Sequence, residues 1–155
     1  MKKHLPFWRC KTFKEMTLAE WEALCDGCGI CCLYKLEDAN TGKVQLTSIA
    51  CRFLNLKTCR CIVYPERKSV TPTCVQLTPQ NVRELEWLPK TCAYRRLAEG
   101  KPLPWWHPLL SGNPGLVHVL GISAIGKCIH ENDNNLKHPE NYTILACNQQ
   151  TGSVE

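Results

Sequence analysis

The densest chemistry in this chain is a run of cysteines, Cys25-Asp-Gly-Cys28-Gly-Ile-Cys31-Cys32, in a sequence that holds twelve cysteines among 155 residues. Two residues between cysteines let both sulfurs converge on one ion, and a glycine after the second allows a turn with positive φ. Backbone N–H groups in such a turn can point at sulfur and stabilise thiolate charge. Zinc and iron both accept this arrangement, so the spacing predicts a metal site without deciding the metal.

Cys31 extends the run to C-x-x-C-x-x-C, the spacing of the cluster-binding run in bacterial ferredoxins. The match is partial, because Cys32 replaces the later cysteine and the proline that follows it. Two adjacent cysteines rarely serve one ion with good geometry, since neighbouring side chains point in different directions. Cys31 and Cys32 therefore either divide between two neighbouring sites or bridge them, and we expect two centres with about four thiolates each.

Disulfides are the other ordinary explanation of many cysteines, and the cellular compartment decides between the two. The basic residues near the N-terminus are followed by no apolar stretch of the kind found in signal peptides. No segment approaches the length of a transmembrane helix. We therefore expect a cytoplasmic protein with no membrane partner, in which thiols stay reduced and cysteine clusters hold metal.

The formal net charge of +5 gives little support to a nucleic-acid partner, because it counts every cysteine as neutral. Metal ligands are thiolates. Two zinc sites with four thiolates each, or two four-iron clusters, would bring the total to roughly +1.

The elements that must position the cysteines are short, because ten prolines and nine glycines interrupt the chain. Thr17-Leu-Ala-Glu20 is a capping box that predicts a helix, with Trp21 and Leu24 on its core face. Residues 33–36 and 43–47 alternate around a loop that contains glycine, which predicts a β-hairpin.

Later segments give weaker patterns. Thr78 and Pro79 favour the start of a helix that runs to about Trp87. Residues 92–100 predict a short helix closed by Gly100. Residues 117–122 predict a strand, after a loop rich in Pro and Trp. In an extended segment Cys59 and Cys61 would place both sulfurs on the same side.

These patterns predict a small, irregular α+β domain with short helices, a β-hairpin and little regular sheet. We expect one cysteine-cluster domain over residues 1–155, with flexible tails at 1–15 and 148–155. Without the cysteines, only about a third of the residues are apolar enough to build a core. Metal binding should therefore contribute to folding.

The combined motifs Cys25-x-x-Cys28-Gly-x-Cys31-Cys32, Cys51-Arg-Phe-Leu54, Cys61-x-x-Tyr64-x-x-Arg67 and Pro72-x-Cys74 resemble the YkgJ-type cysteine-cluster (CxxCxxCC) family, described as zinc- or iron-chelating. Leu88-Pro-x-x-Cys92-Ala-Tyr-Arg95 and Trp106-His-Pro-Leu-x-Ser-Gly112 resemble its YcgN-like branch. The resemblance covers about Trp21 to Ser123.

From the ferredoxin-like spacing and the surplus of cysteines over one four-thiolate site we expect an iron–sulfur cluster of the 4Fe-4S type, with zinc as the alternative. The resemblance implies that nine cysteines bind this metal or cofactor. They are Cys25, Cys28, Cys31, Cys32, Cys51, Cys59, Cys61, Cys74 and Cys92. It gives no role to Cys10, Cys128 and Cys147, which we interpret as small packing residues.

We therefore expect a metal-binding protein that holds iron–sulfur centres or iron in a redox, sensing or scaffold role. One alternative is a zinc-stabilised adaptor that binds a protein or a nucleic acid. A second is an iron–sulfur enzyme, because a related cysteine cluster occurs in the much longer flagellin lysine methylases. No methyl-donor domain, nucleophile–base pair or phosphate loop stands out here, and His107 is expected to be packed or solvated rather than reactive.

Overall fold

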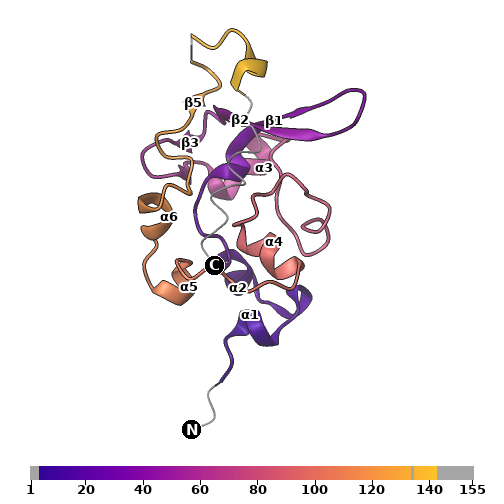
Figure 1. Ribbon diagram of the computed structural model, residues 1–155, viewed down its shortest axis with the longest axis vertical. Helices are drawn as coiled ribbons and strands as arrows, with labels where there is room; N and C mark the ends of the chain where they lie inside the picture. Colours follow the sequence, from indigo (N-terminus) through magenta and orange to yellow (C-terminus); the bar gives the residue numbers. More distant parts are fainter. Residues whose placement is uncertain (1–3, 134, 143–155) are drawn as a thin grey trace.

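The computed structural model describes residues 4–133 and 135–142, which form short helices and two small β-sheets. Figure 1 shows α1 and α2 at one end of the molecule and the β1–β2 hairpin toward the other. The predicted small α+β fold is confirmed. In chain order the elements are α1 Phe7–Cys10, η1 Phe13–Glu15, α2 Leu18–Ala23, η2 Ile30–Cys32, β1 Leu33–Glu37, β2 Val44–Ala50, β3 Leu54–Asn55, β4 Arg60–Cys61, η3 Tyr64–Glu66, α3 Arg67–Val70, α4 Ala93–Ala98, α5 Pro108–Ser111, α6 Leu116–Val119, β5 Ile129–His130 and η4 Pro139–Tyr142.

Helix α2 begins where the capping box predicted. The Thr17 side chain accepts a hydrogen bond from the Glu20 N–H at 3.2 Å, and the Glu20 carboxylate accepts one from the Thr17 N–H at 2.8 Å. These two bonds satisfy N–H groups that a helix start leaves open. The helix ends just before Cys25, so the first cysteine follows a fixed element directly.

The predicted hairpin is confirmed and belongs to a three-stranded sheet with the order β1-β2-β5. Asp38 starts its loop, because its Oδ1 accepts hydrogen bonds from the N–H groups of Asn40 and Thr41 at 2.8 and 2.9 Å. β5 runs parallel to β2 and pairs with its last two residues, Ile49 and Ala50. The hairpin thus holds the end of η2 close to the start of residues 51–61.

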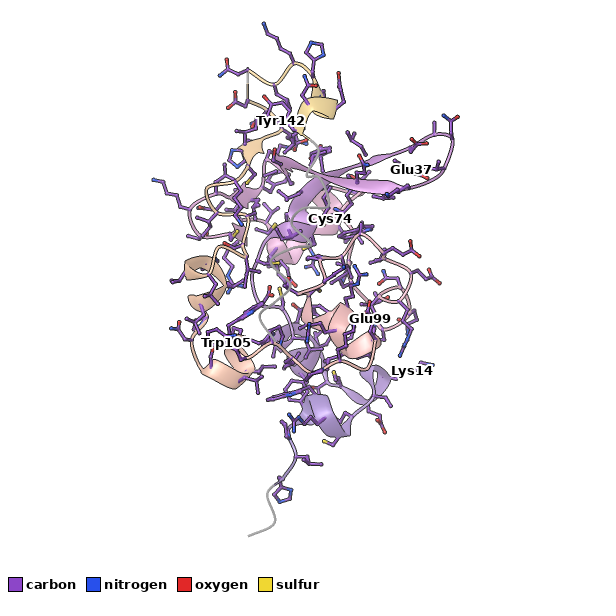
Figure 2. The ribbon with its side chains drawn as sticks, viewed as in Figure 1. Lys14, Glu37, Cys74, Glu99, Trp105 and Tyr142 are labelled. Atoms are coloured by element: carbon purple, nitrogen blue, oxygen red, sulfur yellow. The ribbon has the colours of Figure 1, made fainter. Side chains whose placement is uncertain are left out.

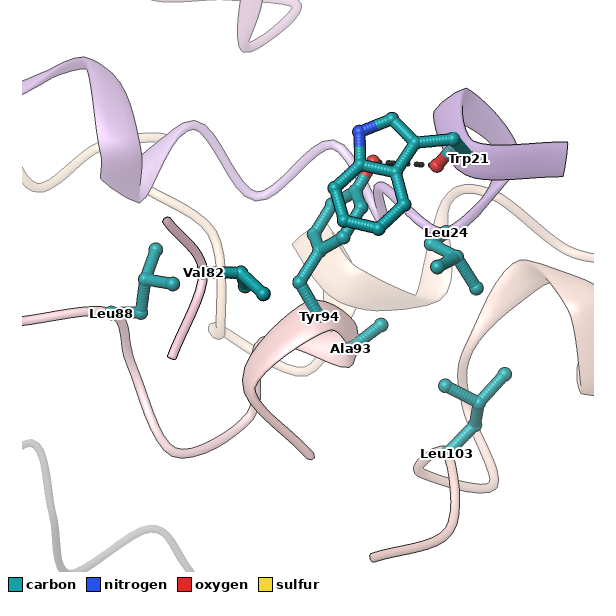
Figure 3. Packing of buried hydrophobic residues seen from close by; sticks show 7 residues of the cluster. All are labelled: Trp21, Leu24, Val82, Leu88, Ala93, Tyr94 and Leu103. Carbon is teal, nitrogen blue, oxygen red and sulfur yellow. Dashed lines mark hydrogen bonds between the residues drawn. The ribbon is translucent and has the colours of Figure 1, made fainter. Parts of the chain in front are cut away.

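The apolar core is divided into clusters, and Figure 3 shows the first of them. Trp21 and Tyr94 form its centre, with ring centroids 4.7 Å apart and the Tyr94 hydroxyl donating to the Trp21 carbonyl at 2.7 Å. Trp21 and Leu24 are buried here, as predicted. The buried members of this first hydrophobic cluster are Trp21, Leu24, Val82, Leu88, Ala93, Tyr94 and Leu103.

Residues 4–15, predicted to belong to a flexible tail, contain α1 and η1 in the structure. Phe7, Trp8 and Phe13 pack against the first hydrophobic cluster. The other predicted tail, 148–155, lies outside the described residues.

Two predicted elements are wrong. Residues 78–87 form successive turns rather than a helix, because Val82 and the following Leu88 are both buried in the core and the Asn81 side chain bonds to the backbone of Thr78 and Gln76. Residues 116–119 form helix α6 rather than a strand. In this helix Val117 is buried and Val119 is 82% exposed. In a strand these two side chains would lie on the same face, so their different exposure fits a helix. No helix in the described part of the chain is both long and apolar enough to cross a membrane.

Candidate metal centre

The run from Cys25 to Cys28 forms the tight turn that its spacing predicted. Gly27 and Gly29 have φ values of 78° and 73°, which residues with a Cβ adopt only with strain. The N–H of Gly27 donates to the Cys25 sulfur, and the N–H of Ile30 donates to the Cys28 sulfur. The two turns therefore aim backbone dipoles at sulfur before any metal binds.

Gly29 is required for a second reason. A Cβ built on it would lie 2.7 Å from the sulfur of Cys59, which is closer than carbon and sulfur can pack. Cys59 is buried, and its sulfur donates to the carbonyl oxygen of Cys28 at 3.3 Å. The turn and residue 59 are thus in direct contact.

Three later cysteines reach the turn through strand pairing and loop contacts. The Cys51 N–H donates to the Cys32 carbonyl at 2.9 Å, next to the Leu33–Ala50 pair of the hairpin. Cys61 is brought alongside by its pairing with Leu54. Cys74 is held by Lys68, whose Nζ donates to the Cys74 carbonyl at 2.8 Å.

Electrostatic contacts between thiols define a first set of cysteines, which we name the knuckle group. Cys25, Cys28 and Cys92 each interact with Cys31. Burial raises the pKa of Cys25 and of Cys92 to about 12 and that of Cys28 well above its usual value. In the metal-free chain the thiols of Cys25, Cys28 and Cys92 therefore keep their protons at neutral pH.

A second set, which we name the hairpin group, comprises Cys32, Cys51, Cys61 and Cys74. Cys32 and Cys74 both interact with Cys51 and Cys61. Figure 2 shows sulfur atoms near Cys74 in the middle of the molecule.

Cys31 and Cys32 connect the two groups. The Cys32 thiol donates to the Cys31 sulfur, which lowers the pKa of Cys31 and raises that of Cys32. Cys31 also interacts with Cys74, so it has neighbours on both sides. It is the middle residue of η2, directly before Cys32 of the hairpin group.

Three predicted or possible ligands lie elsewhere. Cys59 has a positive φ of 57° and is a buried member of a second hydrophobic cluster that also contains Leu33 and Ala50, with Cys128 nearby; its sulfur donates to the Cys28 carbonyl. Its ligand role stays a prediction without a structural argument. Cys10 is exposed on α1, and Cys147 lies outside the described residues.

The thiols are neighbours but are not arranged as a finished metal site. Among residues 4–133 and 135–142, no three Cys, His, Asp or Glu side chains stand in a geometry that could hold an ion. As whole residues Cys25 and Cys31 reach the surface, although protein atoms surround the Cys25 sulfur, and the residues of the hairpin group are partly exposed. Because rotation about χ1 moves a cysteine sulfur without moving the backbone, ligation here requires changes of thiol rotamer.

Basic side chains lie against both groups, which suits sites that carry several thiolates. The Arg60 guanidinium carbon lies 3.3 Å from the position of a Cβ on Gly27, and its charge lowers the pKa of Cys25 against larger opposing effects. Arg67 acts likewise on Cys74 while stacking 3.9 Å from the Tyr64 ring centroid. Arg60 and Arg67 thus place positive charge beside Cys25 and Cys74.

Two further charged residues were not identified from the sequence. Lys35 Nζ donates to the carbonyls of Cys31 and Leu33, both at 2.9 Å. Asp26 is buried inside the turn, where desolvation raises the pKa of its carboxyl. The only sequence signal for Asp26 was its place between two predicted ligands.

His107 is a packed residue with both ring nitrogens engaged. Nδ1 accepts a hydrogen bond from the Leu109 N–H at 3.1 Å, which leaves Nε2 to donate to the Leu24 carbonyl at 2.9 Å. The ring is fully buried. This neutral tautomer fixes the loop before α5 against the end of α2 and leaves no lone pair for a metal.

Comparisons with known proteins point to the same segment. A family model described as "CxxCxxCC: Putative zinc- or iron-chelating domain" matches residues 24–93. A UPF0260 protein of Sinorhizobium fredii is 53% identical over 140 residues, covering 90% of each chain. UPF0260 proteins of Rhizobium leguminosarum and Allorhizobium ampelinum are each 51% identical to this chain. The first match covers 90% of this chain and 88% of the relative, and the second covers 95% of this chain and 96% of the relative. No solved structure matches the chain.

Proposed function

This chain belongs to the UPF0260 family, and we propose that it is a metal-binding protein whose cysteines hold two neighbouring thiolate centres. The observation that supports this proposal is that cysteines distant in the sequence converge in the structure. Cysteines from five separate stretches of chain lie together, with Arg60, Arg67 and Lys35 against them. The members are Cys25, Cys28, Cys31, Cys32, Cys51, Cys61, Cys74 and Cys92.

The donor chemistry of the described residues suits such a group. Thiolates in two adjacent sets match the needs of zinc and of iron–sulfur clusters. Asp26 has a buried carboxylate oxygen without a hydrogen-bond partner among the described residues, and basic side chains lie beside the thiols. The first feature suits a bound cation and the second suits several thiolates. The knuckle group would hold one centre and the hairpin group the other.

Iron–sulfur centres are the first choice, because Cys25, Cys28 and Cys31 have ferredoxin-like spacing and the thiols outnumber a single four-thiolate site. Such a centre supplies one-electron transfer, so the role would be redox, sensing or scaffolding. The chain itself would fix the sulfurs, hold them partly out of water, and balance their charge with lysine and arginine.

The zinc-stabilised adaptor is the second candidate, and the same convergence of thiols supports it. Two closed four-thiolate zinc sites would use the same eight sulfurs and add no redox chemistry. A protein partner would then use the surface around the centres.

The test is purification of the full chain without air, followed by metal analysis and visible absorption. Iron and sulfide with a brown colour support the first candidate, and a colourless protein with about two zinc ions per chain supports the second. Cys28→Ser should lose metal, whereas Cys10→Ser, which changes an exposed cysteine on α1, should not. Equal metal in both variants, or no metal in the wild type, would overturn the proposal.

A further inference from the structure

Asp26 places a buried carboxylate among the cysteines. It is 6% exposed and lies between Cys25 and Cys28 in the tight turn. Its Oδ1 accepts a hydrogen bond from the Cys28 N–H at 2.9 Å. Its Oδ2 is buried and has no hydrogen-bond partner in the described part of the chain.

In the described part of the chain no basic side chain forms an ion pair with this carboxylate, although Arg60 lies against the same turn at Gly27. Lys35 is engaged by two carbonyls and by the Trp87 ring, whose centroid is 4.1 Å from Nζ. His107 is held as a neutral ring. Removing an unpaired carboxylate from water costs several kcal/mol, so this position calls for a cation.

The surroundings of Asp26 indicate which cation. The Asp26 carboxylate interacts electrostatically with Cys25, Cys28 and Cys31 and with Cys92. These four cysteines are the members of the knuckle group. Within that group only Cys25, Cys28 and Cys31 come from one continuous run, and three ligands leave a tetrahedral ion one short. Carboxylate oxygen is an accepted fourth ligand of zinc and iron.

We propose that Asp26 Oδ2 is a metal ligand, so that the knuckle group holds its ion with the sulfurs of Cys25, Cys28 and Cys31 and one carboxylate oxygen. The inference rests on the proposed function, because it assigns a ligand within one of the two centres. The two centres then differ chemically. The centre of the hairpin group has four thiolates, whereas the ion in the knuckle group uses three of that group's four cysteines and one harder, more readily exchanged oxygen.

The experiment uses cobalt(II) as the probe, because thiolate–cobalt bonds absorb strongly in the near ultraviolet and can be counted. The full chain is produced with cobalt, purified without air, and analysed for cobalt per chain and for this absorption. Asp26→Asn keeps the acceptor for the Cys28 N–H and removes the charge. Asp26→Cys replaces the oxygen ligand by a sulfur. Cys92→Ser tests the other candidate for the fourth position.

Asp26→Asn should lose about half of the bound cobalt, since one of two centres loses a ligand. Asp26→Cys should keep the wild-type cobalt content and gain one thiolate–cobalt bond, a rise of about one seventh in absorption per chain. Cys92→Ser should lose less cobalt than Asp26→Asn, and Cys10→Ser, which changes an exposed cysteine on α1, should match the wild type. Circular dichroism of each variant verifies that the fold is kept.

Three results would overturn the inference. Wild-type cobalt content and absorption in Asp26→Asn would show that the carboxylate binds no metal. Loss of cobalt in Cys92→Ser alone would make Cys92 the fourth ligand. If cobalt is lost in Asp26→Asn and is not recovered in Asp26→Cys, Asp26 supports the shape of the turn and does not bind the metal. A wild-type chain that binds neither cobalt, zinc nor iron would instead refute the proposed function.

Discussion

Lys35 Nζ donates a hydrogen bond to the carbonyl oxygen of Cys31 at 2.9 Å, which fixes a positive charge beside the cysteine that the two thiol groups share. The same ammonium group lies 4.1 Å from the centroid of the Trp87 ring. The electrostatic partners of Lys35 include Cys31 and Cys32 together with Cys51 and Cys74 of the hairpin group. Two carbonyl oxygens and an aromatic ring hold the ammonium group of Lys35 beside the thiols, where its positive charge stabilises thiolates.

Lys35→Gln should therefore weaken metal binding. We expect metal to pass to a chelator roughly three- to tenfold faster, a change of about 1 kcal/mol. Lys43→Gln removes the same charge from the exposed hairpin loop and should release metal at the wild-type rate. Equal rates in both variants would show that the charge of Lys35 does not act on the centres.

Cys31→Ala and Cys32→Ala should each remove about half of the metal, because each residue serves a different centre. Double variants sharpen the test. Adding Cys74→Ser to Cys32→Ala should remove little more, since both belong to the hairpin group, whereas adding it to Cys31→Ala should remove nearly all. One shared centre would instead be emptied by any one of these substitutions. Metal content per chain is the measurement.

Gly29→Ala should destabilise the fold more than Gly112→Ala does. Both glycines have a φ near 70°, so each substitution carries about 1–2 kcal/mol of backbone strain. Only the Cβ at residue 29 meets an atom, the Cys59 sulfur at 2.7 Å, while residue 112 has open space. Urea denaturation measures the difference in the free energy of unfolding.

The double variant Gly29→Ala with Cys59→Ala separates two roles of Cys59. If its sulfur only packs, removing it should recover part of the stability lost in Gly29→Ala and leave the metal content unchanged. A loss of metal in Cys59→Ala alone would instead support the predicted ligand role.

His107→Ala should lower the free energy of unfolding by about 3 kcal/mol, because it opens a cavity and leaves two backbone groups without a partner. The metal content of the folded fraction should not change, since neither ring nitrogen is free. His138→Ala is the control, because His138 is exposed and makes only a surface ion pair with Glu140. Loss of metal at full stability in His107→Ala would contradict this account.

The stability of the metal-free chain should fall as the pH rises above 9. Burial raises the pKa of Cys25 and Cys92 from the ordinary value of 9.0 to about 12. The unfolded chain then loses these protons first, so the stabilisation is complete below pH 9 and is lost as the pH approaches 12. Urea midpoints with excess chelator, at about pH 8 and about pH 10.5, measure the fall.

The variant with both Cys25→Ser and Cys92→Ser should show a smaller decrease over the same range, because serine does not titrate there. A wild-type midpoint that stays constant or rises would mean that these thiols are as well solvated in the folded chain as in the unfolded one.

The sequence alone determined the local geometry of the site. The turn from Cys25 to Gly29 depends on residues within a few positions of one another, and positive φ at residues 27 and 29 is available at low cost only to glycine. The capping box of Thr17 and Glu20 likewise placed the start of α2. Such features need no distant partner, so their residue types suffice to predict them.

Tertiary structure alone decided which cysteines meet. Cys59 and Cys61 are two residues apart and were expected on one side. Instead Cys59, with a positive φ, is buried in the second hydrophobic cluster with its sulfur on the Cys28 carbonyl, while Cys61 pairs with Leu54 and belongs to the hairpin group. Contacts of Cys51, Cys74 and Cys92 with the turn span tens of residues, and no local pattern encodes them. The same long-range packing replaced the predicted helix at 78–87 with turns, because burial of Val82 and Leu88 outweighs weak helix propensity.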